Sequence, residues 1–279
     1  MCLLVFAWKT EAGFPLVVAA NRDERLDRPA HAICVLRDRD PRVLGGRDDL
    51  AGGTWLAVNE HGVVAGLTNR PSPGGRDPTK RSRGELPLMV AAHRTAEAGV
   101  RALSRRVEPG RYNPAWLLVG DRDSLFYVEL ALDQAPSVTS LSPGIHILEN
   151  VGLGERSPKV SRIRSLISEA DHGAVPLWAA LPGILADHTV PSEPDDVPSE
   201  ADDPSEPDDV GRGDETVIRP TATLAACVHT EEYGTRSAAL VRIAPEPGAL
   251  PDVLVADGPP CTASFVDNSP WWVAGGRKP

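Results

Sequence analysis

The sequence lacks the short motifs that mark many large enzyme classes. It contains no G-x-S-x-G elbow, no H-E-x-x-H, no phosphate-binding loop, no C-x-x-C-H and no dinucleotide-binding fingerprint. We therefore expect neither a bound cofactor nor a metal site. His146 and His229 lie in strand-like runs, and each is expected to be a structural histidine.

Cysteine is scarce, with four residues in a chain of 279: Cys2, Cys34, Cys227 and Cys261. No two of them form a C-x-x-C pair, and their spacing matches no common metal site, which is typical of free thiols in a reducing compartment. The N-terminal apolar run is short and has no basic segment before it, so neither a signal peptide nor a membrane span is expected. These features predict a soluble cytoplasmic protein.

Basic patches are also missing. The net charge is -10, but residues 191–214 hold ten acidic residues and one arginine, which leaves about -1 for the rest of the chain. A nearly neutral remainder shows neither the footprint of a nucleic-acid-binding protein nor a polybasic membrane surface. We expect a small-molecule partner, no nucleic acid and no membrane span.

The acidic segment is itself a repeat, PSEPDDV, PSEADD, PSEPDDV. Repeated proline, clustered acids and low hydrophobicity predict that it stays disordered. An EF-hand calcium loop is the alternative, but the alternating ligands and the central glycine are missing. We expect one domain over residues 1–279, interrupted by a disordered insertion at 191–214.

Two apolar runs open the chain, Met1 to Trp8 and Phe14 to Ala20, separated by a hairpin-sized polar break that contains Gly13. If the runs pair antiparallel, Cys2 lies beside Asn21-Arg22-Asp23-Glu24. Four polar residues directly after a buried strand are costly unless they reach a solvated edge or pair with one another. A functional site at this edge would explain them.

Cys2 is the candidate nucleophile. Removal of Met1 would leave Cys2 with both a thiol and a free α-amine, whose ordinary pKa values of about 8.5 and about 7.7 to 8.0 allow proton transfer near neutral pH. Asp23 could hold that amine, and Arg22 could stabilise a thiolate or bind an anionic substrate group. The alternative is that Cys2 is a small buried hydrophobe, as cysteines in apolar strands commonly are.

The remaining pattern is strands, helices, strands, helices and strands. Strands are expected at 33–36, 52–58 (after a glycine turn), 63–67, 115–120, 125–130, 145–148, 223–228, 237–243, 252–256 and 262–266. Helices are expected at 85–107, 158–170 and 176–187, and residues 70–83 form a loop rich in proline, glycine and basic residues. Short hairpin loops and segregated helices favour an α+β sandwich of antiparallel sheets over a doubly wound sheet.

Several short motifs together resemble the NRDE family, that of the transport and Golgi organisation 2 proteins. They are Met1-Cys2, Asn21 to Glu24, Arg28-Pro29, Gly52 to Leu56, Thr68-Asn69, Arg83 to Leu86, Tyr112-Asn113 and Tyr233 to Arg236. This family in turn resembles N-terminal-nucleophile (Ntn) hydrolases of the cholylglycine hydrolase and penicillin V acylase type. The resemblance implies a four-layer αββα fold.

The same resemblance implies roles for individual residues. Cys2 would be the nucleophile and Asp23 the acid that contacts its amine, while Asn69 and Asn150 would form the oxyanion hole and orient the nucleophile. Arg236 resembles a catalytic arginine near the C-terminal strands. Substrate contacts are expected from Asn21, Arg22, Glu24, Thr54 and Trp55, although Arg22 and Glu24 could equally form a structural ion pair. Glu149 stands before Asn150, where a small polar residue is expected.

Two functions follow from these residues and the resemblance. The first is an amidohydrolase or acyltransferase that acts on a linear amide or acyl group through an acyl-enzyme on Cys2. The second is a binding or trafficking protein that uses the same pocket for haem or another hydrophobic ligand, because family members are linked to haem and lipid handling. The sequence shows no axial-ligand motif for haem.

Overall fold

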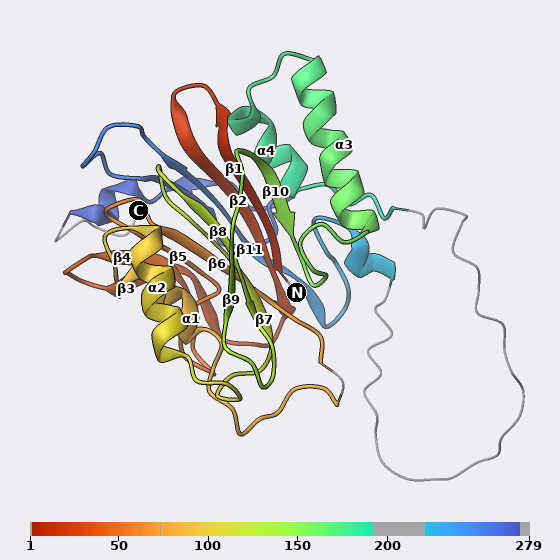
Figure 1. The fold of residues 1–279 in the computed structure, drawn as a ribbon. Coiled ribbons are helices and arrows are strands. Elements are labelled where there is room, and N and C mark those ends of the chain that lie inside the picture. The colour runs from red at the N-terminus through yellow and green to blue at the C-terminus, as the bar shows by residue number, and fades with distance from the viewer. Residues whose placement is uncertain (1, 73, 192–220, 274–279) are drawn as a thin grey trace, which may run out of the picture.

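The first two strands of the chain pair as the sequence predicts (Figure 1). In the computed structural model, which describes residues 2–72, 74–191 and 221–273, strand β1 (Cys2–Glu11) runs antiparallel to β2 (Phe14–Arg25). Cys2 pairs with Arg22 across the hairpin. The polar residues after the second apolar run therefore lie beside Cys2.

Two antiparallel sheets form the centre of the molecule. The first has the order β10-β1-β2-β11-β12-β13 and adds β10 (Gly144–Leu148), β11 (Tyr233–Ile243), β12 (Asp252–Ala256) and β13 (Val266–Asp267) to the opening hairpin. The second is a meander of β3 (Ala30–Arg37), β4 (Val43–Asp48), β5 (Leu56–Asn59), β6 (Val64–Asn69), β7 (Ala115–Gly120), β8 (Leu125–Leu130) and β9 (Ser137–Ser140).

Helices cover the outer face of each sheet (Figure 1). Helices α3 (Pro158–His172) and α4 (Leu177–Leu185) pack on the first sheet, and α1 (Glu85–Ala91) and α2 (Ala96–Arg106) pack on the second. Two short 3-10 helices lie at Thr221–Leu224 and Ser269–Trp272. The predicted four-layer αββα arrangement of antiparallel sheets is confirmed.

Successive side chains along β1 and β2 point alternately into two separate layers of the core. Leu4, Phe6 and Val18 are buried between the two sheets, whereas Leu3 and Val17 are buried between the first sheet and helices α3 and α4. Side chains two residues apart on a strand share a face. The same alternation therefore decides which residues after position 20 face the second sheet and which face the helices.

The predicted helix at 85–107 is two helices instead of one. Asn59 Nδ2 donates hydrogen bonds of 2.8 and 2.7 Å to the carbonyls of Ala91 and His93, so these groups are satisfied outside a helix. The second helix then starts afresh, with the Thr95 hydroxyl accepting from the Ala98 amide as an N-cap. Helix α1 therefore ends where Asn59, which is distant in the sequence, binds these carbonyls.

Some strand predictions were also wrong. Residues 223–228 form the end of a 3-10 helix and a turn, and the strand expected at 262–266 is reduced to β13. Strands β4 and β9 were missed because β4 contains Gly45 and Gly46 and β9 is an exposed polar edge strand. Gly45 is required there, since a Cβ would lie 2.2 Å from the Leu56 carbonyl oxygen.

Two predictions concern the chain as a whole. The acidic insertion at 191–214 lies, apart from Pro191, outside the described residues, and the single-domain organisation stays a prediction. Within the part of the chain that the structure describes, no helix is both long and apolar enough to cross a membrane.

Candidate active site

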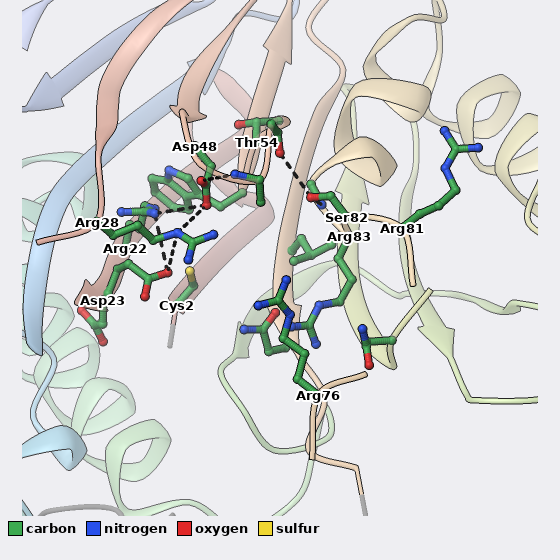
Figure 2. Close-up of a pocket in the computed structure, with 18 residues that line it drawn as sticks. Cys2, Arg22, Asp23, Arg28, Asp48, Thr54, Arg76, Arg81, Ser82 and Arg83 are labelled. Atoms are coloured by element: carbon green, nitrogen blue, oxygen red, sulfur yellow. Dashed lines mark hydrogen bonds and ion pairs between the residues drawn. The ribbon is translucent and has the colours of Figure 1, made fainter. Parts of the chain in front are cut away.

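A polar cavity of about 250 Å³ opens where the paired ends of β1 and β2 meet the second sheet (Figure 2). Its lining comes from the opening hairpin, from the segment around β4 and β5, from the end of β6 and from the loop before α1. The lining residues are Cys2, Arg22, Asp23, Glu24, Arg28, Asp48, Ala51, Gly52, Thr54, Trp55, Leu67, Asn69, Arg76, Arg81, Ser82, Arg83, Gly84 and Asn113.

Cys2 is the one cysteine among the described residues that line this cavity. It packs at the edge of the core between the two sheets and is partly buried. Burial raises the pKa of the Cys2 thiol above its ordinary value, and the neighbouring Arg22 opposes that rise. A thiol in this position needs a base to react at neutral pH.

Asp23 is among the lining residues, but its carboxylate is held on the helix-facing side of the strand, toward α3. The Thr235 hydroxyl donates a 2.6 Å hydrogen bond to Asp23 Oδ1, and Lys159 Nζ lies 3.7 Å from Oδ2. Both side chains of this ion pair are almost completely buried. The carboxylate is thus fixed from β11 and from the first turn of α3, directly next to the residue that pairs with Cys2.

Arg22 lies on the same face as Cys2 and belongs to a network of charges. Its Nη2 lies 3.6 Å from Glu24 Oε2 and 3.7 Å from Asp48 Oδ2, and Arg28 Nε lies 2.8 Å from the same Asp48 oxygen. Figure 2 shows Arg22, Arg28 and Asp48 together on the side of the cavity that carries Cys2. Arg22 Nη1 is buried and has no hydrogen-bond partner among the described residues, so it is a donor available to a ligand.

The opposite wall of the cavity carries further arginines from the 70–83 loop. Arg83 Nη1 donates to the Pro114 carbonyl at 3.0 Å, and burial together with Arg76 lowers the pKa of Arg83 to about 10. Within the described chain, neither Arg76 nor Arg83 has a carboxylate within 4 Å. Arg81, in contrast, pairs with Glu85 at 2.5 Å. This wall therefore has a local excess of positive charge.

The other expected site residues lie at different depths. Thr54, Trp55 and Asn69 line the cavity, but the Thr54 hydroxyl is used within its own turn, donating to the Leu56 carbonyl at 2.7 Å. Asn150 is not part of the lining; its Nδ2 donates a 2.6 Å hydrogen bond to the Asn69 carbonyl. The preceding Glu149 is buried and accepts a short hydrogen bond from Ser157.

Like Asn150, two further expected residues lie outside the cavity. Asn21 shares the helix-facing side with Asp23, and its Nδ2 donates to the carbonyls of Leu185 and Ala226 at 2.9 and 2.8 Å. Arg236 Nη1 donates to backbone carbonyls at the end of β2 and just after it, including that of Arg25 at 2.9 Å. Strand alternation turns Asn21 away from Cys2, and Arg236 braces the chain behind the cavity instead of lining it.

The family model for Transport and Golgi organisation 2 matches residues 1–247. The chain belongs to this family. It is 29% identical over 261 residues to the Transport and Golgi organization protein 2 homolog of Bos taurus, with 87% of this chain and 88% of that protein covered. Its identity to the Homo sapiens homolog is 27% over 257 residues, with the same coverage of each chain. The NRDE-family resemblance is confirmed.

Solved structures with a similar arrangement include hydrolases. Penicillin V acylase from Agrobacterium tumefaciens is 12% identical, with 96% of this Transport and Golgi organisation 2 family chain and 86% of that chain covered and a TM-score of 0.46. The Caenorhabditis elegans ortholog of N-acylethanolamine-hydrolyzing acid amidase is 14% identical, with 60% and 79% covered and a TM-score of 0.46.

Several residues at or next to the site of this family member were not predicted from the sequence. Lys159 lies four residues before Ile163 and seven before Leu166, so a charged residue on the apolar face of α3 was the available signal for a buried ion pair. Asp48 and Arg83 had no such signal, because only the tertiary fold brings their segments to the opening hairpin.

A haem ligand in the cavity would depend on the same cysteine. Among the described lining residues there is no histidine, methionine or tyrosine, so Cys2 is the side chain that could ligate haem iron there. If this Transport and Golgi organisation 2 family chain bound haem in the cavity, Cys2 would be the residue that holds the iron.

Proposed function

We propose that this chain is an N-terminal cysteine amidohydrolase, or an acyltransferase that uses the same acyl-enzyme. The observation that carries the proposal is the arrangement around Cys2: a thiol in the wall of a polar cavity, a buried arginine donor beside it, and a fixed carboxylate on the next residue of the paired strand. Nucleophile, electrostatic donor and orienting acid are the three parts that acyl transfer requires.

The first half of the reaction forms a thioester. Removal of Met1 would free the α-amine of Cys2, which accepts the Sγ proton while Asp23 orients it. The thiolate attacks the carbonyl carbon of a linear amide to give a tetrahedral oxyanion. The carbon–nitrogen bond then breaks as the α-ammonium returns the proton to the leaving nitrogen, and the acyl group remains on Cys2.

The second half releases the acyl group. Water attacks the thioester, the α-amine accepts its proton, and the Cys2 thiol is restored as the carboxylic acid leaves. An amine or thiol acceptor in place of water makes the reaction an acyl transfer. Arg22 Nη1 is one donor for the oxyanion, and Asn69 and Asn150 are the proposed others.

The substrate is proposed to carry an anionic group. Arg76 and Arg83 line the cavity without a carboxylate within 4 Å in the described part of the chain, whereas Arg22 and Arg28 already share Glu24 and Asp48. Arginine presents fixed donors that suit a carboxylate or phosphate. We therefore place the acyl carbonyl near Cys2 and the anionic end toward the loop before α1.

The test begins at the N-terminus of untagged protein. Peptide mass analysis should show that Met1 is absent, and brief alkylation at several pH values should label Cys2 faster at pH 7 than Cys34. Because burial raises the pKa of the Cys2 thiol, a chain with an N-terminal extension before Cys2 should lose this advantage and react appreciably only at alkaline pH.

Turnover is then tested with acyl amides that carry a carboxylate or phosphate. A short reaction should leave the acyl mass on the Cys2 peptide, and Asn150→Ala should lower kcat by about two to three orders of magnitude. Cys34→Ser is the matched control and should leave the labelling of Cys2 and the turnover unchanged. A retained Met1, a Cys2 as inert as Cys34, or full turnover by Cys2→Ala would overturn the proposal.

A further inference from the structure

Two cysteines and two histidines gather on the far side of β11 from the cavity. They are His188 after α4, Cys227 and His229 before β11, and Cys261 after β12. One potential ligand atom from each residue lies within 4.8 Å of all the others. We propose that His188, Cys227, His229 and Cys261 form a structural zinc site.

The distances between these atoms are those of ligands around one ion. Cys227 Sγ lies 3.8 Å from Cys261 Sγ, and His229 Nε2 lies 3.4 and 3.3 Å from the two sulfurs. Tetrahedral zinc, with bonds of about 2.3 Å to sulfur and about 2.0 Å to nitrogen, separates two sulfur ligands by about 3.8 Å and a sulfur from a nitrogen by about 3.5 Å. A disulfide would require the sulfurs to be about 2.05 Å apart.

The fourth ligand is oriented by the backbone. His188 Nδ1 lies 3.3 Å from the Cys227 carbonyl oxygen, and the two imidazole rings have centroids 4.8 Å apart with a tilt of 54°. A proton donated from Nδ1 to this carbonyl leaves Nε2 for the metal, which is the usual way that a histidine ligand is fixed. Two sulfur and two nitrogen ligands in a tetrahedral set are typical of structural zinc.

Burial and access also fit a structural site. Cys227 is 1% exposed, whereas both histidines are exposed, so the ion would be held at the surface with an open path for entry. Four protein ligands leave no coordination position for a substrate, which distinguishes a structural zinc from a catalytic one.

The position in the chain gives the site its role. The Cys227 amide donates to the Asp187 carbonyl at 2.9 Å, and the Val228 amide donates to the hydroxyl of Thr235, which in turn donates to Asp23. His188 and Cys227 are 39 residues apart in the sequence, and Cys227 and Cys261 are 34 apart. A bound ion would close both loops and brace the strand that fixes Asp23.

The experiment uses full-length protein without a polyhistidine tag, purified without chelator. Elemental analysis should give about one zinc per chain, as for a closed four-ligand site. Cys227→Ser, Cys261→Ser and His188→Ala should each lose that zinc, whereas Cys34→Ser and His172→Ala, which remove the same residue types elsewhere, should retain it. Zinc that survives Cys227→Ser, or its absence from the wild-type protein, would overturn the proposal.

A second measurement avoids variants that fail to fold. Wild-type protein is stripped of metal with a chelator under reducing conditions and titrated with Co²⁺ alone. The proposal predicts a thiolate-to-cobalt charge-transfer band and intense visible bands of tetrahedral cobalt, saturating at about one equivalent, together with a thermal midpoint that falls on stripping and recovers with zinc. Weak octahedral bands, or an unchanged midpoint, would contradict it.

Discussion

Cys2 and the pair Cys227 and Cys261 are the same residue type in opposite surroundings. Cys2 lies beside Arg22 in a cavity whose lining holds five arginines and no histidine among the described residues. Cys227 and Cys261 lie on the other side of the first sheet, 3.4 and 3.3 Å from a histidine nitrogen. The first setting is the one we propose for attack on a carbonyl, and the second is the one we propose for coordination of a metal ion.

A short chain of hydrogen bonds connects these two regions. Thr235 on β11 donates to Asp23 on one side and accepts from the Val228 amide, next to Cys227, on the other. The first sheet therefore separates the proposed reactive face from the proposed bracing face, with β2 and β11 between them. The comparison can be tested by removing a group on one face and measuring both the activity at Cys2 and the zinc content.

Cys2→Ala should have the largest effect and should act on one face alone. Without the thiol no acyl-enzyme can form, so we expect kcat to fall by at least about 1,000-fold, as for other nucleophiles that act with a base. The zinc content measured on the same sample should stay at the wild-type value. Loss of zinc in Cys2→Ala would show that the two regions are not separate.

Lys159→Met should be the most destabilising of these changes. The methionine keeps the length of the side chain but leaves Asp23 charged and buried, and we expect about 3 kcal/mol less stability in urea unfolding.

A double-variant cycle provides the control for this prediction. Asp23→Asn removes the other charge, so the combination with Lys159→Met should cost less than the sum of the two single changes. Simple additivity would mean that Lys159 and Asp23 do not stabilise each other.

Thr235→Val should have a smaller effect that reaches both regions. The valine has the shape of threonine but can neither donate to Asp23 nor accept from the Val228 amide, so we expect a loss of about 1 to 2 kcal/mol. Zinc should dissociate faster on chelator challenge, and Cys2 should be alkylated more slowly at pH 7. Thr235→Ser restores the hydroxyl and should recover both rates. If neither rate recovered, the Thr235 hydroxyl would not connect the two regions.

Local patterns in the sequence were sufficient to predict the strand pairing at the edge of the cavity. Two apolar runs around Gly13 predict the hairpin, and antiparallel pairing then puts Cys2 opposite Arg22. The polar residues that follow alternate, however, and the prediction treated them as one group. Asn21 and Asp23 face the helices, while Arg22 and Glu24 face the second sheet.

Contacts between distant segments could not be predicted in this way. Arg76 and Arg83 come from a loop whose composition shows only that it is a loop, and the four proposed zinc ligands are spread over 74 positions without a recognisable spacing. Neither the sheet order nor the packing of α4 against β2 follows from local periodicity. Only Lys159, charged on an apolar helix face, could have been found from the sequence.

The smallest effect concerns the charge of the cavity and needs no substrate. Iodoacetate and iodoacetamide differ mainly in one negative charge. Arg76 and Arg83 should therefore favour iodoacetate at Cys2, relative to the same ratio of rates at Cys34, by about three- to tenfold at low salt. Peptide mass analysis measures both cysteines in one sample. Because exposed charges are screened over about 10 Å at 0.1 M salt, the preference should shrink as salt is added.

Matched arginine variants decide whether these side chains cause the preference. Arg83→Gln and Arg76→Gln should each lower the iodoacetate preference at Cys2, whereas Arg101→Gln, which removes an exposed arginine paired with Glu97 on α2, should not. The rate with neutral iodoacetamide should change little in all three variants. An equal fall for both reagents would mean that the loop arginines act on the Cys2 thiol itself, and the proposed anionic substrate group would lose its support.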